Sequence, residues 1–250
     1  MDTHEIDQQA PHQVMRIAEL RVHLPRMLVV LGTPVAFAVT GLLEFLGLVP
    51  WPRSEIDIYT RLRDHAALWI ASHVVQLLLI LLLAVAVYWL AEGLTSNAAR
   101  VCRVALLPYV VFYSAFAAIT GVSRGLVAHY GSQLPSTRQG ALPGVIGVLD
   151  LSPQHPVPFT IALIGALSWA VAVVAAAVAL RQAGATWTAT IALGLAGVIG
   201  AIGDGPPYGP IAMALFLTAA AVLSRPRKPP ILEPGLRDPT RQPAPANTSA

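Results

Sequence analysis

Three polar side chains lie inside a long uncharged stretch of the sequence. Residues 66–91 carry no charge, yet Ser72, His73 and Gln76 lie in the first half of this stretch. Together with Trp69 they recur at steps of three and four residues, which places them on one face of a helix. Because a histidine can accept or release a proton near neutral pH, this face could support acid–base chemistry.

A carboxylate is predicted at the same depth as His73. Glu44 lies about 9 Å of helix before Pro50, where an earlier apolar stretch ends, and His73 lies about 10 Å into its own stretch. The two stretches run in opposite directions and a short loop joins them, so we predict a direct contact between Glu44 and His73. Such a pair could transfer a proton, or it could be purely structural.

Further polar residues are predicted near the same end of the helices. Asp204 lies between glycines ahead of two prolines, so it is either a second acid–base group or a turn residue. Arg124 would either bind an anionic head group or extend its side chain toward the membrane surface. The candidate substrate-binding residues share positions on two polar helix faces: Arg124, Tyr113, Trp69 and Gln76.

Six apolar stretches must form the elements that position these residues, and each is close to the length that crosses a membrane. Crossing about 30 Å of hydrocarbon takes roughly 20 helical residues, because lipid offers backbone groups no other partner. The stretches are residues 27–49, 66–91, 104–127, 157–180, 185–203 and 206–223. The sequence therefore predicts an all-α fold, a polytopic membrane bundle of six transmembrane helices.

Composition and charge support a membrane protein. Of the 250 residues, 55% are hydrophobic and 12% charged, against about 25% charged in soluble domains. The 16 basic residues are dispersed, so the net charge of +3 indicates no nucleic-acid surface. Basic residues are more frequent on the side that holds the N-terminus, which predicts that both termini are cytoplasmic.

The chain divides into three predicted parts. Residues 1–25 form a cytoplasmic or interfacial segment, residues 26–223 the six-helix domain, and residues 224–250 a disordered, proline-rich cytoplasmic tail. The long outer loop at 129–156 is either a re-entrant flap or a plain connector.

Glycine spacing predicts close helix packing, and the cysteine and histidine positions argue against a metal site. Gly121 and Gly125 form a GxxxG pattern, which favours close packing of transmembrane helices. Cys102 is the single cysteine, so an intrachain disulfide and a cysteine metal cluster are excluded. No histidine spacing typical of a metal or haem site occurs in the spans, and we expect no cofactor and no metal.

Three short segments carry a family resemblance. They are "RIAEL", "TGLLEFLG" and "LLLAVAVYWLAEGLTSNAARVCRVAL", all within the first half of the chain. In these segments the chain resembles a broad group of uncharacterised six-helix bacterial integral membrane proteins. The resemblance implies the six-helix architecture and no catalytic residues. The expected location is a cell membrane crossed several times, in a bacterium the inner or cytoplasmic membrane.

The sequence thus predicts an integral membrane protein with a polar, ionisable pocket in the outer half of the bundle. The most specific hypothesis is an intramembrane enzyme that performs acid–base chemistry on a lipid or isoprenoid-like substrate, with Glu44, His73 and Asp204 as catalytic groups. The alternatives are a structural or accessory membrane subunit and a proton-coupled transporter of small solutes. The expected partners are the lipid bilayer and an amphiphilic small molecule, while protein partners are not indicated.

Overall fold

The computed structural model describes residues 10–43, 55–151, 153–203 and 207–224, with side chains except those of residues 10–24, 55–58 and 61. These ranges are helical and contain no strand, which confirms the all-α class. The elements are α1 (Ala10–Leu43), α2 (Glu55–Leu90), α3 (Asn97–Ala117), the π-helix η2 (Ala118–Ser123), α4 (Arg124–Gly131), α5 (Ser136–Gln139), α6 (Leu142–Val148), α7 (Pro156–Gln182), α8 (Trp187–Ile202) and α9 (Tyr208–Leu223).

Four helical segments in the described ranges are long and apolar enough to cross a membrane. They are Pro25–Leu43, Leu62–Leu90, Asn97–Gly131 and Pro156–Gln182. Helices α8 and α9 are strongly apolar but have 16 residues each. Their length of about 24 Å falls short of a hydrocarbon core of about 30 Å. Six spans therefore remain a prediction for this last pair.

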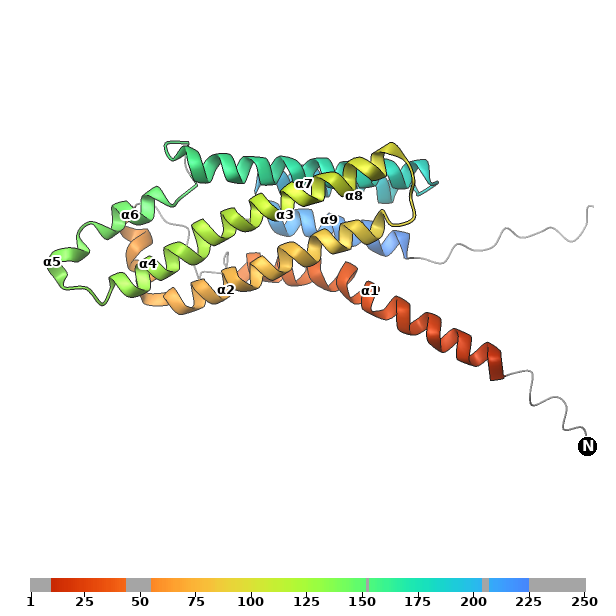
Figure 1. Cartoon of the computed structure of the whole chain (residues 1–250), viewed down its shortest axis with the longest axis horizontal. Coiled ribbons are helices and arrows are strands. Elements are labelled where there is room, and N and C mark those ends of the chain that lie inside the picture. The colour runs from red at the N-terminus through yellow and green to blue at the C-terminus, as the bar shows by residue number, and fades with distance from the viewer. Residues whose placement is uncertain (1–9, 44–54, 152, 204–206, 225–250) are drawn as a thin grey trace, which may run out of the picture.

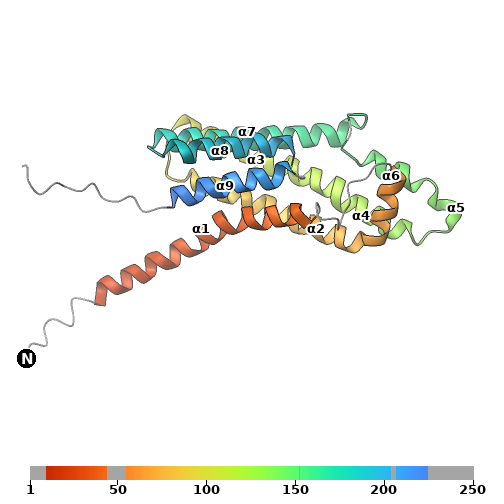
Figure 2. The same ribbon diagram turned by 180° about the vertical axis from the view of Figure 1, so that it is seen from behind.

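Six helices form a closed ring. Helix α3 packs along α7, followed in order by α8, α9, α1 and α2, and α2 closes the ring on α3. Figures 1 and 2 show these helices running nearly parallel to one another as a bundle. Small residues permit the closest approach: a Cβ added to Gly165 of α7 would lie 2.9 Å from the backbone nitrogen of Tyr113 on α3.

Large apolar side chains cover the outside of the ring. Val104 and Leu107 of α3 are each at least 70% exposed, and α7 exposes Val157 and Leu167 in the same way. Soluble monomers rarely expose apolar surface on this scale. This outer surface is therefore suited to contact with lipid chains.

The two ends of the bundle are built differently. We call the end with loops 91–96 and 183–186 the inner end, and the opposite end, which holds residues 129–155, the outer end. Helix α1 begins and α9 ends at the inner end (Figure 1). Which side of the membrane this end faces stays a prediction.

The inner-end loops are held by caps and arginines. Ser96 and Thr186 accept hydrogen bonds from the backbone N–H groups three residues later, as N-caps do. Arg103 donates to the carbonyls of Ala91 and Leu94, and Arg181 donates to that of Ala185 at 3.0 Å. These arginines supply donors to carbonyl groups at and just beyond helix ends, where the regular helical hydrogen bonds stop.

At the outer end, helix α2 bends, and the long loop is folded against the bundle. His65 has φ −127° and ψ 21°, which interrupts the regular geometry of α2. Beyond this bend Tyr59 and Leu62 pack with Ala128 of α4 and Ile146 of α6, and Ile146 is fully buried. Figures 1 and 2 show α4, α5, α6 and the beginning of α2 together at this end.

Candidate functional site

His73 is one of four buried polar or charged side chains among those the structure describes. It lies eleven residues after Leu62, where the apolar segment of α2 begins, or about 16 Å along the helix. Its side chain is 8% exposed. Ionisable groups at such depth are costly and are functional candidates for that reason.

The hydrogen bonds of His73 determine the form of its ring. Nδ1 lies 2.9 Å from the backbone carbonyl oxygen of Trp69, one turn earlier in α2. A carbonyl oxygen only accepts, so Nδ1 carries the proton and donates it to this bond. In the neutral ring, Nε2 then carries the lone pair and is the atom that can accept a proton. Ser72 Oγ donates to the same carbonyl at 2.8 Å and adds to its polar environment.

The indole ring of Trp69 also contacts the imidazole ring of His73. The indole and imidazole ring centroids are 4.3 Å apart. The indole Nε1 donates a 2.8 Å hydrogen bond to the carbonyl of Gly121, which belongs to η2. Trp69 is therefore a positioning residue, because it orients the His73 ring and ties α2 to η2.

Gly121 makes room for the imidazole ring. A Cβ at this position would lie only 1.9 Å from Cδ2 of His73, far inside contact distance. At Gly125 a Cβ would lie 2.5 Å from Cγ1 of Ile70, also on α2. The close approach that the GxxxG pattern predicts is thus confirmed, and one of its two glycines contacts the candidate acid–base residue.

The π-helix lies directly opposite His73. Two hydroxyl groups donate to backbone carbonyls in this segment: Ser123 to the carbonyl of Ala118 at 3.1 Å and Thr120 to that of Phe116 at 2.9 Å. Short π segments within α-helices occur frequently at functional sites. The structure therefore places an irregular backbone segment and a buried histidine in one contact.

Arg124 follows η2 directly and is buried with a carboxylate beside it. Its Nη1 donates to Oδ1 of Asp150 at 3.0 Å. Arg124 is 7% exposed, whereas the Asp150 side chain is 39% exposed. The same oxygen of Asp150 accepts from the backbone N–H of Leu151 at 2.9 Å. This pair joins the end of the long loop to the helix that carries the π segment.

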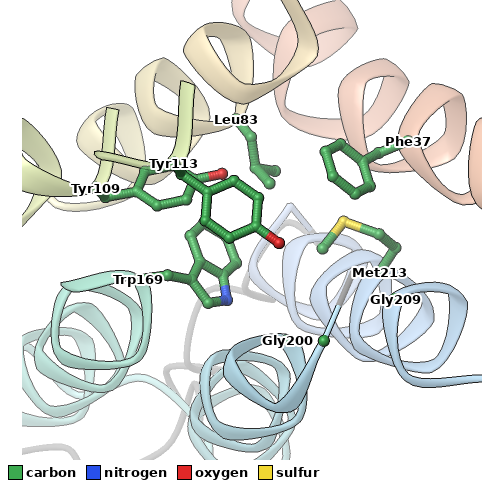
Figure 3. Close-up of a pocket in the computed structure, with 9 residues that line it drawn as sticks. Phe37, Leu83, Tyr109, Tyr113, Trp169, Gly200, Gly209 and Met213 are labelled. Carbon is green, nitrogen blue, oxygen red and sulfur yellow. The ribbon is translucent and has the colours of Figure 1, made fainter. Parts of the chain in front are cut away.

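A separate aromatic cavity lies on the axis of the six-helix ring. Its volume of about 20 Å³ corresponds to one or two water molecules. Figure 3 shows the ring of Tyr113 in its wall, with Trp169 on one side and Phe37 and Met213 across from it. Every helix of the ring contributes to the lining, which consists of Phe37, Leu83, Tyr109, Tyr113, Trp169, Gly200, Gly203, Gly209 and Met213.

The predicted site residues thus lie in three places. His73 and Trp69 are in contact, and Gln76 is half-buried about one turn farther along α2. Tyr113 lines the aromatic cavity and precedes Gly121 by eight residues, about 12 Å toward the inner end from the level of His73. Arg124 pairs with Asp150. Glu44 and Asp204 lie outside the described residues, so the predicted Glu44–His73 contact remains a prediction.

Two features of the site were not assigned from the sequence. Asp150 is 26 residues from Arg124 along an irregular loop, and no spacing rule connects them. The π-helix likewise has no periodicity signal, although the GxxxG pattern marked its position. Within the described ranges no group of three or more His, Cys, Asp or Glu side chains could hold a metal ion.

No protein-family model, no curated protein and no solved structure matches this chain. The geometry of the described residues is therefore the basis for the functional proposals.

Proposed function

We propose that this chain is an integral membrane protein, spanning the bilayer several times, with an acid–base site in its outer half. The four long apolar helices and the exposed apolar side chains around the ring support membrane embedding. The proposed location is a cell membrane, with both termini on the cytoplasmic side.

We further propose that the protein is an intramembrane enzyme that acts on a lipid or isoprenoid-like amphiphile. The supporting observation is the buried His73 ring, whose Nδ1 donates to the Trp69 carbonyl and whose Nε2 is therefore the basic atom. Nε2 would take a proton from the substrate, and a proton that originates in water would replace it at another position or on the same atom. The proposal includes Glu44 as the partner of His73, because the sequence predicts the two residues at the same depth in the membrane.

Deuterium exchange tests this reaction class without a known substrate. The purified protein in lipid nanodiscs would be incubated in D₂O with lipid and isoprenoid extracts, and the products analysed by mass spectrometry. We expect deuterium at carbon in one amphiphile class, and we expect His73→Gln to abolish this incorporation. His129→Gln is the matched control, since His129 is exposed near the end of α4 and should leave incorporation unchanged. Absence of incorporation by the unmodified protein would contradict an acid–base enzyme.

A structural or accessory role is the second candidate. The observation in its favour is the small aromatic cavity, because about 20 Å³ on the ring axis is far below the 300 Å³ or more of usual ligand pockets. An accessory subunit would co-purify with a defined membrane complex. It would also remain functional in a deletion strain when Glu44 and His73 are both replaced.

A further inference from the structure

Arg124 is the one arginine or lysine that is buried in the described part of the chain, and most of its donors have no partner there. A guanidinium has five N–H donors, and within the described ranges Arg124 makes one hydrogen bond, from Nη1 to Asp150. Its Nε is fully buried and has no partner among the described residues. Burying a charge with unsatisfied donors costs free energy, so its retention calls for a physical reason.

Backbone stabilisation does not supply that reason. Arg103 and Arg181 donate to loop carbonyls at the inner end, whereas Arg124 donates to no backbone carbonyl within the described ranges. Asp150 also leaves much of the guanidinium uncompensated, because it engages a single nitrogen. Its carboxylate is partly exposed and has a second donor in the Leu151 N–H. A carboxylate in this position can turn toward water when another anion binds the guanidinium.

The position of Arg124 along the membrane favours an amphiphilic ligand. The residue lies seven positions before Gly131, where the apolar segment of α3, η2 and α4 ends at the outer side. Gly121, which contacts the His73 ring, is three residues away, or about 4.5 Å along the helix. An anionic head group at Arg124 would therefore place the first carbons of its chain at the depth of His73.

We infer that Arg124 binds the anionic head group, a phosphate or a carboxylate, of the amphiphile on which the His73 site acts, and that this head group replaces Asp150 as the partner of the guanidinium. Guanidinium groups bind such oxyanions through two parallel hydrogen bonds, and Nε with one Nη nitrogen is a suitable donor pair. This inference rests on the proposed function and adds the substrate class to it.

Lipid binding tests the inference independently of turnover. The full-length protein would be reconstituted in nanodiscs of phosphatidylcholine with increasing phosphatidylglycerol, and retained lipids would be counted by native mass spectrometry. We expect a preference for phosphatidylglycerol that falls about tenfold or more in Arg124→Gln, as expected for the loss of a charge-assisted hydrogen bond. Arg138→Gln is the matched control, because Arg138 is an exposed arginine at the same end and should keep the preference.

Asp150→Asn separates a binding site from a structural ion pair. The amide keeps an oxygen for Arg124 and for the Leu151 N–H but removes the competing charge, so we expect the preference to rise. A lower or unchanged preference in Asp150→Asn would overturn the inference even if Arg124→Gln fails to fold. An unchanged preference in Arg124→Gln would overturn it as well.

Two further arms identify the source of the anion and separate the two proposals. Inorganic phosphate added at millimolar concentration should leave the preference intact if the ligand is a lipid head group. Displacement of the lipid by phosphate would overturn the inference that the ligand is an amphiphile and would indicate a soluble anion instead. His73→Gln should bind phosphatidylglycerol like the unmodified protein while losing deuterium incorporation. Head-group binding without any incorporation would contradict the enzyme and leave the Arg124 site supported.

Discussion

Arginine side chains occur at both ends of the bundle, and their surroundings differ. At the inner end Arg103 and Arg181 donate to backbone carbonyls of the loops they adjoin, and Arg181 also lies 4.3 Å from the ring centroid of Trp187. Arg26 pairs there with Glu92 at 2.8 Å, with both side chains about 40% exposed. At the outer end Arg124 is buried, and one carboxylate oxygen engages one of its nitrogens.

The difference lies in desolvation cost and in contact with the backbone. The inner-end arginines complete helix ends and keep contact with water, so they stabilise the loops at low desolvation cost. Arg124 incurs a large desolvation cost and stabilises no described loop carbonyl. The outer end also holds the second orphaned polar atom of the described residues, the hydroxyl of Tyr59. The arginines of the inner end thus bind loop carbonyls, whereas the outer end holds two buried polar atoms, Tyr59 Oη and Arg124 Nε, that have no partner among the described residues.

The largest effect is expected from filling the space between η2 and α2. Gly121→Ala places a Cβ 1.9 Å from the His73 ring, so the ring must move or the helices must separate. We expect the free energy of unfolding to fall by about 3 kcal/mol, as in overpacked cores. Chemical denaturation in mixed micelles would measure it. Gly194→Ala, with no atom within 4 Å of the added Cβ, should be neutral or slightly stabilising, and equal effects at both positions would refute the close packing.

A smaller loss is expected when an inner-end arginine is removed. Arg103→Ala removes the side-chain donor to the carbonyls of Ala91 and Leu94, and the Ala91 carbonyl keeps only the Leu94 N–H. We expect a loss of about 2 kcal/mol in the free energy of unfolding, typical of hydrogen bonds from charged groups. Arg100→Ala, at an exposed position on the same helix, should stay within about 0.5 kcal/mol. An unchanged free energy of unfolding in Arg103→Ala would contradict the stabilising role assigned to the inner-end arginines.

Arg124→Gln should change stability less than Arg103→Ala does. The substitution removes an ion pair but also removes the desolvation penalty of a buried cation, and the partly exposed Asp150 regains water. We therefore expect a change below about 1 kcal/mol in the same denaturation assay. A loss as large as that of Arg103→Ala would make Arg124 a structural residue and erase the contrast between the two ends.

The smallest effect is expected at Tyr59. Tyr59→Phe keeps the ring against Leu62 and Ile146 and removes a buried hydroxyl that has no partner among the described residues. We expect a gain of about 0.5 kcal/mol, visible as a small rise in Tm. Tyr130→Phe, at an exposed position, should leave Tm unchanged. A clear loss of stability in Tyr59→Phe would show that this hydroxyl is engaged in the folded protein.

Apolar length and helical spacing were enough to predict the six helices of the ring and some of their buried positions, but not the short helices α5 and α6 within residues 129–156. On the third stretch, the predicted site residues Tyr113 and Arg124 are both buried. On the second stretch Trp69 and His73 lie together, whereas His65 marks a bend. The bend was not predictable, because a histidine carries no helix-breaking signal comparable to that of proline.

The contacts that define the site were not predictable from spacing. Trp69 and Gly121 are 52 residues apart, and their hydrogen bond depends on how two long helices align. The Arg124–Asp150 pair depends on how the long loop returns to the bundle. Periodicity determines which face of a helix is buried, but the alignment of two helices along their axes depends on side-chain packing. That alignment decides which residues meet.

At the π-helix, one continuous helix changes its packing partners. Before η2, α3 packs chiefly on α7, and after it α4 packs on α2 and α6. Each residue of a regular helix turns the chain by about 100°, so the register of everything after η2 depends on the number of residues within it. Deleting a single residue from 118–123 would keep every buried side chain of α4 in the sequence. By the same geometry it would rotate Arg124 and its neighbours relative to α3, whereas a substitution within η2 leaves the number of its residues unchanged.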